Sequence, residues 1–260
     1  MKSLTEFGMT YVGSIINYSD LAKLAIQVAQ KISEPNLSRR TTELANAHLN
    51  SKENYLKAYA KLNHLLVSLK NKSEIEKQSI LPEVERAAYI FIVSGKNSLD
   101  MLACIMDILE NKIVRPENKL PDFYSSNYVS ASSDIKMLID GVKTSVWADS
   151  LKEARNKILH RGYNIAIALN DTNNFEVLMT KTEIAFAEFE NNIVLDAILG
   201  VELMKKNALD IESIMQGLSF DLCKFEYDVA NKFVNENIIG LDSSLINNWV
   251  IPSFRLINNY

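Results

Sequence analysis

The chain has 260 residues, of which 47% are hydrophobic and 23% are charged, as in a globular protein with a full core. Its net charge of −4 excludes the overall basic character of many nucleic-acid-binding proteins. The longest uninterrupted apolar run, 87–93, is far shorter than the roughly 18–20 residues of a membrane-spanning helix. The N-terminal residues also lack the pattern of a secretion signal. We therefore expect a cytoplasmic protein without a membrane span.

The cysteines and histidines do not predict a metal or cofactor site. Cys104 and Cys223 stand alone, without a Cys-x-x-Cys spacing, and are expected to be buried, reduced thiols. His48 and His64 share no metal-ligand spacing with each other or with a carboxylate pair, so structural roles are expected for both. The sequence also contains no Gly-rich phosphate loop and no His-Glu-x-x-His motif.

The N-terminal part of the sequence predicts long helices. The first thirty residues have a helical period that ends at Glu34-Pro35-Asn36, and Ser38 to Lys70 predicts a second helix. Ser73-x-x-Glu76 is a capping box, and Pro82 predicts that a third long helix begins just after it. The apolar residues of this third helix recur at steps of mostly three and four: Phe91, Ile92, Gly95, Leu99, Leu102, Met106 and Leu109.

The middle of the sequence changes from loop to helix. Two prolines and a Ser-rich run predict a long surface connection over Arg115 to Ser133. Helical patterns begin again at about Asp134 and, after Asp140-Gly141, at about Ser145, where they continue to Arg161. Gly162 is suited to end this helix in the left-handed conformation.

The C-terminal part predicts a hairpin and then more helix. Asn164–Leu169 and Phe175–Thr180 alternate around a polar turn, which predicts a small β-hairpin. Glu190 to Val234 is helical in period, with a bend near Gly217, and the tail after Gly240 is expected to be irregular.

Together these elements predict an all-α fold, an antiparallel helical bundle with a small β-hairpin insertion. The chain is expected to be a single helical domain over 1–260. It would comprise an N-terminal helical extension (1–75), a core of about 80–215, and a C-terminal helix and tail (216–260).

The helix ending near Arg161 has two distinct faces. At about 100° per residue, four apolar side chains fall in one narrow stripe and must face the core: Trp147, Leu151, Ala154 and Ile158. Four polar side chains fall on the opposite side: Asp149, Glu153, Asn156 and His160. Because the core stripe is already complete, His160 is expected to face outward, either as an ordinary surface residue or as part of a site.

Basic residues gather along the same helix. Between Lys143 and Arg161 the sequence contains five Lys and Arg residues and two acidic residues, which gives a local charge of +3. A guanidinium fork holds a phosphate and an imidazole moves a proton, so this combination suits phosphodiester chemistry. Arg155 and His160 are therefore the candidate catalytic residues, unless these charges only form a solvated polar face. Lys152, Lys157, Arg161 and Tyr163 are the candidate substrate-binding residues.

At these residues the chain resembles the HEPN superfamily, helical proteins of prokaryotic defence and toxin–antitoxin systems. Arg155-Asn156-x3-His160 is similar to the family's Arg-x(4–6)-His motif with a polar residue after the Arg. The resemblance implies a metal-independent endoribonuclease that acts on RNA without a cofactor, as a homodimer through the motif helix. By this resemblance Arg155 would hold the scissile phosphate, His160 would act as acid and base, and Asn156 would position either of them.

The resemblance also implies partners, namely an antitoxin or a nucleotidyltransferase. Some members carry a Tyr two residues after the His, where the nucleotidyltransferase modifies them, whereas this chain has Gly162 there and Tyr163 one place later. Many HEPN-like proteins have lost catalysis. Two alternatives to the nuclease therefore stay open: an inactive helical module that binds RNA, nucleotide or a protein, and a helical scaffold whose motif is accidental.

Overall fold

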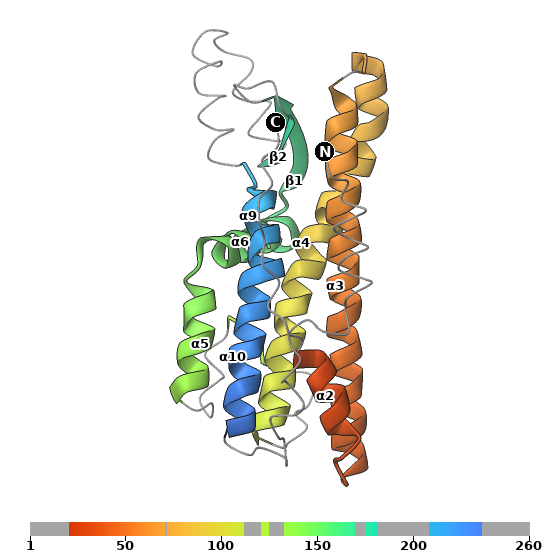
Figure 1. The fold of residues 1–260 in the computed structure, drawn as a ribbon. Coiled ribbons are helices and arrows are strands. Elements are labelled where there is room, and N and C mark those ends of the chain that lie inside the picture. The colour runs from red at the N-terminus through yellow and green to blue at the C-terminus, as the bar shows by residue number, and fades with distance from the viewer. Residues whose placement is uncertain are drawn as a thin grey trace.

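The computed structural model describes residues 21–70, 72–111, 121–124, 133–169, 175–180 and 208–235. These residues form long helices and one two-stranded antiparallel sheet (Figure 1). The longest helices run side by side along the length of the molecule, and the sheet lies towards one end. The prediction of a mostly helical chain with a small β-hairpin is therefore confirmed.

Two long helices, α3 (Pro35–Leu69) and α4 (Glu74–Asn111), pack against each other along the molecule (Figure 1). Glu34 caps the first turn of α3, because its carboxylate accepts hydrogen bonds from the backbone N–H groups of Asn36 and Leu37. Pro35 occupies the first turn, where its missing N–H costs nothing. Glu34-Pro35-Asn36 therefore opens α3 instead of ending the preceding helix, and the predicted start at Ser38 is three residues late.

Helix α4 begins at the predicted capping box. The Ser73 N–H donates to Glu76 Oε2 at 2.9 Å, and the Glu76 N–H lies 3.5 Å from Ser73 Oγ. The predicted start after Pro82 is wrong, because Pro82 lies inside α4. An interior proline costs a helix about 3 kcal/mol. Burial of Val84 and Ala87 in the core directly after the proline offsets this cost.

The structure next describes α5 (Ser133–Lys143), α6 (Val146–His160) and the strands β1 (Asn164–Leu169) and β2 (Phe175–Thr180). These bounds confirm the predicted helices and hairpin, although α5 continues through Gly141. The antiparallel register pairs the first residue of β1 with the last residue of β2. The turn between the strands lies outside the described residues.

The C-terminal helices are α9 (Ile211–Gln216), the π-helical turn η3 (Gly217–Asp221) and α10 (Leu222–Asn235). The predicted bend near Gly217 corresponds to this π-helical turn. The predicted continuous helix from Glu190 to Val234 is wrong at Ala208, which pairs with Leu178 of β2 in an isolated β-bridge. Residues 190–207 and the tail after Gly240 lie outside the described part of the chain.

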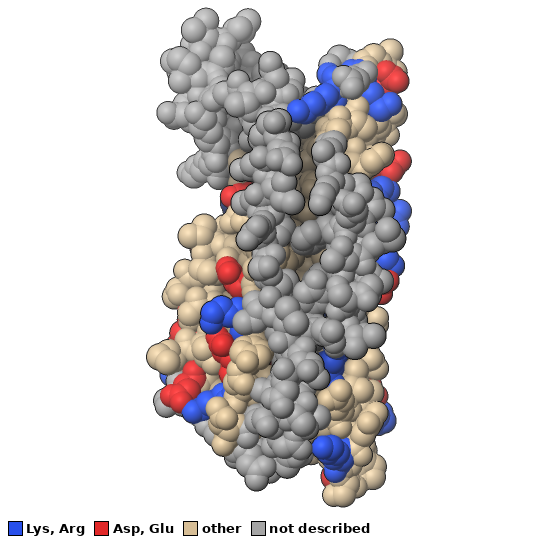
Figure 2. Space-filling view, viewed as in Figure 1, with Lys and Arg blue, Asp and Glu red and all other residues tan. Residues whose placement is uncertain are grey.

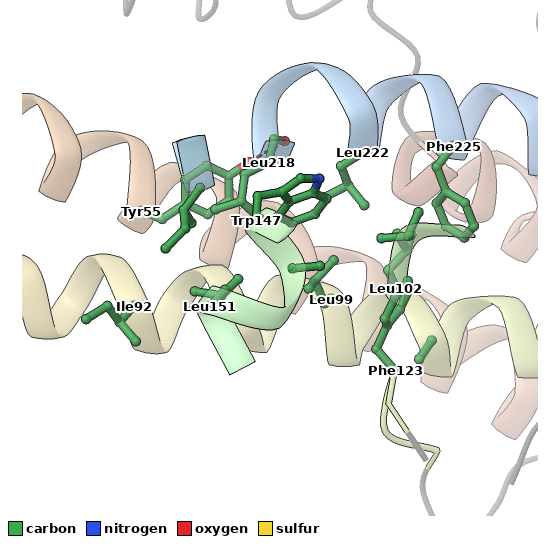
Figure 3. Packing of buried hydrophobic residues seen from close by; sticks show 14 of the residues in the cluster. Tyr55, Ile92, Leu99, Leu102, Phe123, Trp147, Leu151, Leu218, Leu222 and Phe225 are labelled. Atoms are coloured by element: carbon green, nitrogen blue, oxygen red, sulfur yellow. Dashed lines mark hydrogen bonds between the residues drawn. The ribbon is translucent and has the colours of Figure 1, made fainter. Parts of the chain in front are cut away.

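The short helix α2 (Leu21–Ala29) packs against α3, α4 and α10. One cluster of buried side chains extends from α2 to α10. It includes the whole predicted stripe of α4 apart from Gly95, which lacks a side chain but is itself buried. Figure 3 shows the centre of this cluster, where α4, α6 and the C-terminal helices meet: Ile92, Leu99, Leu102, Trp147, Leu151, Leu218 and Leu222.

The predicted surface connection over Arg115–Ser133 is wrong in its described part, Pro121 to Tyr124. The Phe123 side chain is fully buried and meets Phe225 of α10 edge to face, with ring centroids 5.8 Å apart. The Tyr124 hydroxyl donates to the Ala148 carbonyl of α6 at 2.6 Å. Phe123 and Tyr124 therefore pack against the bundle and connect this segment to α10 and α6.

Residues 75–111 of α4 are long and apolar enough, by length and composition alone, to cross a membrane. However, 61% of the most apolar 18-residue window is buried inside the molecule. Core helices of soluble proteins pass the same test. The apolar character of α4 is therefore explained by its central place between α3, α6 and the C-terminal helices.

Candidate functional site

Helix α6 turns one face to the core and the other outward. The predicted core stripe is confirmed and consists of the buried Trp147, Leu151 and Ala154 and the partly buried Ile158. On the opposite side, Asp149 and His160 are exposed, and Glu153 and Asn156 are partly exposed. The motif residues therefore belong to a face that their own core does not use.

The N-terminal end of α6 is anchored by a close approach to the π-helical turn. The Trp147 indole lies directly over Gly217, where a Cβ atom would come within 2.0 Å of Trp147 Cδ2. Only glycine leaves room for the indole at this position. Figure 3 shows Trp147 beside Leu218 and Leu222 at this contact. The Trp147 indole in the first turn of α6 is thus fixed between α4 and the C-terminal helices.

The C-terminal end of α6 stops sharply at Gly162, as predicted. Gly162 adopts φ +66°, which is favourable only for glycine and a few polar residues. The backbone N–H groups of Arg161 and Tyr163 both donate to the Lys157 carbonyl, at 3.2 and 3.1 Å. This turn leaves His160 in the last, exposed turn of the helix and returns Tyr163 to the side of Lys157.

The three candidate catalytic residues meet at this end of α6. Arg155 Nη1 lies 2.7 Å from His160 Nε2 and 3.4 Å from Asn156 Oδ1. A guanidinium has no acceptor, so Nε2 accepts this hydrogen bond and the ring proton of a neutral His160 is on Nδ1. Arg155 is five residues before His160, and its long side chain spans more than one helical turn. The structure therefore brings together the arginine, the amide and the imidazole that the sequence singles out.

The candidate substrate-binding residues each contact a neighbour in the same chain. Lys152 Nζ lies 5.1 Å from the centroid of the Tyr124 ring, and Lys157 Nζ lies 5.6 Å from that of Tyr163. Arg161 Nη1 donates to Glu153 Oε1 at 2.8 Å. Lys157, Arg161 and Tyr163 therefore remain near His160, whereas Lys152 is held on the side of Tyr124.

A network that the sequence did not predict fixes Tyr124. The buried Lys96 of α4 donates to Asp100 at 2.5 Å and to Asp122 at 3.3 Å, and its Nζ lies 4.9 Å from the Tyr124 ring centroid. Burial raises the pKa of the Asp100 carboxyl, although Lys96 opposes this shift. The signal in the sequence was the adjacent aromatic pair Phe123-Tyr124 within the Pro- and Ser-containing connection.

A second unpredicted polar cluster lies inside the bundle around Glu226 of α10. Its carboxylate accepts from Lys52 Nζ of α3 at 2.8 Å and from the Leu21 N–H of α2 at 2.7 Å. His48, predicted to be structural, is fully buried, with Nδ1 2.8 Å from the Ser98 carbonyl of α4 and Nε2 3.7 Å from Glu226. Burial opposes ionisation of Glu226, but Lys52 and His48 lower its pKa to about 2.

The described surface on the face drawn in Figure 2 shows no broad basic area. Lys and Arg lie among Asp and Glu over much of the described surface visible in Figure 2, as expected for a net charge of −4. A contact with RNA on this chain would therefore be local, and the candidate is the end of α6, where Arg155 contacts the exposed His160.

No protein-family model, curated protein or solved structure matches the chain. Within the described ranges, no group of three or more His, Cys, Asp or Glu side chains lies close enough to hold a metal ion. Both cysteines are buried thiols outside any disulfide, as predicted. The chemistry available at α6 therefore follows from the geometry of its own side chains.

Proposed function

We propose that the chain is an endoribonuclease that cleaves RNA by acid–base chemistry without a metal ion. The observation that carries this proposal is the 2.7 Å contact between Arg155 Nη1 and His160 Nε2 at the exposed end of α6. An arginine fork binds phosphate oxygens and an imidazole transfers protons near neutral pH. Because the two groups touch, both can reach a single phosphodiester.

In the proposed reaction, the substrate phosphate replaces His160 as the partner of Arg155 and thereby frees Nε2 to act as a base. Nε2 accepts the proton of a ribose 2′-hydroxyl, O2′ attacks phosphorus, and the bond between phosphorus and O5′ breaks. The leaving O5′ receives a proton through His160. The products are a 2′,3′-cyclic phosphate and a 5′-hydroxyl, and Asn156 helps to hold the Arg155 fork throughout.

The wider assignment rests on the resemblance of Arg155-Asn156-x3-His160 to the HEPN motif. On this basis we propose a HEPN-like bundle that works as a cytoplasmic homodimer through α6, in a toxin or antiviral-defence role. An antitoxin or a nucleotidyltransferase is the partner that this role implies. The outward orientation of the motif face supports the dimer, because such a face is available to a second subunit.

A second candidate is an inactive HEPN-like module that binds RNA, nucleotide or a protein partner. The observation that favours it is that the cations of α6 already have partners in their own chain. Arg161 contacts Glu153, and Lys152 and Lys157 lie over tyrosine rings. A binding surface of this kind needs no proton transfer. The nuclease and the binding module therefore differ in whether loss of His160 abolishes RNA cleavage.

The test is incubation of the purified chain with RNA in EDTA, followed by analysis of the product ends. We expect cleavage with 2′,3′-cyclic phosphate ends, lost in both Arg155→Ala and His160→Ala. Matched controls are Arg39→Ala and His64→Ala, since both residues are exposed on α3. Absence of cleavage by the wild type, or equal cleavage by His160→Ala, would overturn the nuclease proposal and leave the binding module.

A further inference from the structure

The polar residues on the outward face of α6 are spaced symmetrically along the helix. They are Asp149, Glu153, Asn156 and His160, at steps of four, three and four. If a second copy of α6 lies antiparallel on this face, one twofold axis between positions 154 and 155 pairs 149 with 160 and 153 with 156. Such a self-complementary pattern is what an isologous interface requires.

The chemistry of the four side chains follows the same symmetry. The N-terminal half of the face carries the carboxylates Asp149 and Glu153, whereas the C-terminal half carries Asn156 and His160. Asn156 Oδ1 already lies near Arg155, so its Nδ2 amide remains to donate. Antiparallel pairing therefore places an acceptor opposite a donor at every position. A parallel pairing would instead place Asp149 against Asp149.

The His160 ring has a hydrogen-bond donor without an acceptor in the described part of its own chain. Its Nε2 accepts from Arg155, so its Nδ1 carries a proton and needs an acceptor. Within the described residues, only Arg155 hydrogen bonds to the His160 ring, and the exposed Asp149 carboxylate makes no hydrogen bond or ion pair, although it lies close enough to Tyr124 for an electrostatic interaction. A carboxylate on Nδ1–H fixes the orientation of an imidazole and stabilises the imidazolium that forms during proton transfer.

We infer that two copies pair antiparallel along α6 and that Asp149 of one copy orients His160 of the other. This inference rests on the proposed function, because it assigns a positioning residue to the same site. In each composite site, one copy supplies Arg155 and His160 together, and the second copy supplies Asp149.

An exposed apolar residue fits the same register. Val146, the first residue of α6, is 80% exposed, and no other aliphatic side chain of the described part of α6 is as open. The twofold axis that pairs Asp149 with His160 also places Val146 just beyond the C-terminal end of the second copy's α6, where that chain turns at Gly162. Burial of Val146 against the second copy would remove apolar surface from water at both ends of the interface.

Heterodimers of two inactive variants test the assignment of Asp149. In a dimer of an Asp149→Asn chain and a His160→Ala chain, isolated with two different tags, one site keeps both His160 and Asp149. We expect each variant alone to lose most RNA cleavage and this heterodimer to recover about half of the wild-type rate, since one of two symmetric sites is intact. The Arg155→Ala and His160→Ala heterodimer should stay inactive, because those residues act from the same chain. Asp149→Glu should restore activity in part.

Disulfide cross-linking tests the register without any need for activity. The native Cys104 and Cys223 are buried, so introduced cysteines report the interface. Under mild oxidation we expect the Asp149→Cys/His160→Cys chain to form a covalent dimer. In the control Asp149→Cys/Asn156→Cys, the second cysteine lies about one turn, or about 6 Å, from the position opposite residue 149. This control should therefore not form the covalent dimer. Positions 149 and 160 are about 16 Å apart along one helix, which excludes a bond within one chain.

The outcomes separate this inference from the proposed function. A wild type that cleaves no RNA but forms the matched cross-link would contradict the nuclease and support the antiparallel pairing. A wild type that cleaves RNA as a monomer, or a heterodimer of Asp149→Asn and His160→Ala that stays inactive, would overturn the role of Asp149. Equal cross-linking of the Asp149→Cys/His160→Cys chain and the Asp149→Cys/Asn156→Cys chain would overturn the proposed register.

Discussion

The molecule contains two histidine-centred clusters, one buried between helices and one exposed at the end of α6. Around Glu226, donors from α2 and α3 converge on one carboxylate, and His48 connects this carboxylate to α4. At the end of α6, Arg155 and His160 touch each other in contact with solvent. Similar chemical groups therefore lie in two different environments: the buried cluster joins helices of the core, and the exposed cluster is accessible to solvent.

The largest expected effect on stability is that of Glu226→Gln. The variant removes the negative charge that pairs with the buried Lys52 and weakens the hydrogen bond from the Leu21 N–H, which should lower the free energy of unfolding by about 3–5 kcal/mol. Denaturant unfolding followed by circular dichroism measures the change. The control is Asp228→Asn, which breaks a more exposed pair with Lys224 on the same helix and should cost about 0–1 kcal/mol. Equal losses in both variants would remove the distinction between buried and exposed clusters.

The same carboxylate predicts how stability depends on pH. Its pKa is about 2 in the folded chain and is near its usual value in the unfolded chain, so the folded state binds fewer protons at acidic pH. The stabilisation is fully present above pH 4.5 and is lost as the pH falls towards 2, by about 3 kcal/mol. Unfolding of the wild type and Glu226→Gln at several pH values checks this. Their difference should shrink on acidification, and a constant difference would contradict the ionic role of Glu226.

Gly217→Ala tests the contact that anchors α6. The new Cβ would lie within 2.4 Å of three Trp147 ring atoms, so the indole or the helix must move, at a cost of about 1–3 kcal/mol. Gly141→Ala is the matched control. It lies in α5 with no atom within 4 Å of the new Cβ and should stabilise the chain by about 0.5–1 kcal/mol. Thermal unfolding of both variants provides the measurement, and similar shifts would contradict the role of the Trp147 contact.

The smallest expected effect is that of Glu153→Gln beside the exposed cluster. Glu153 and Arg161 are 42% and 56% exposed, so loss of their ion pair should change the free energy of unfolding by only about 0–1 kcal/mol. Release of Arg161 should instead strengthen RNA binding, which a filter-binding titration at low and high salt would detect. Unchanged RNA affinity would show that Arg161 does not face the substrate.

The sequence predicted those parts of the fold that depend on local pattern. The faces of α6, the capping box at Ser73, the end of α6 at Gly162 and both strands of the hairpin are examples, because periodicity and turn chemistry determine them. The interpretation of Pro82 failed because packing along α3 outweighs the local cost of a proline.

The candidate site was predictable only in part. The spacing of Arg155 and His160 shows that both lie near the end of one helix, but not that their side chains touch. The Glu226 cluster could not be predicted, since its members are up to 205 positions apart and meet only when four helices assemble. The packing of Phe123 and Tyr124 was missed for the same reason, because only tertiary contacts distinguish a buried connection from an exposed one.

The most direct test of the central claim is the rate at which His160→Ala cleaves a defined single-stranded RNA in EDTA, relative to the wild type. Because His160 is exposed and outside the core, the variant should stay as stable as the wild type and yet cleave about 100 to 10,000 times more slowly. A rate equal to that of the wild type would contradict the claim that the exposed cluster is the reactive one.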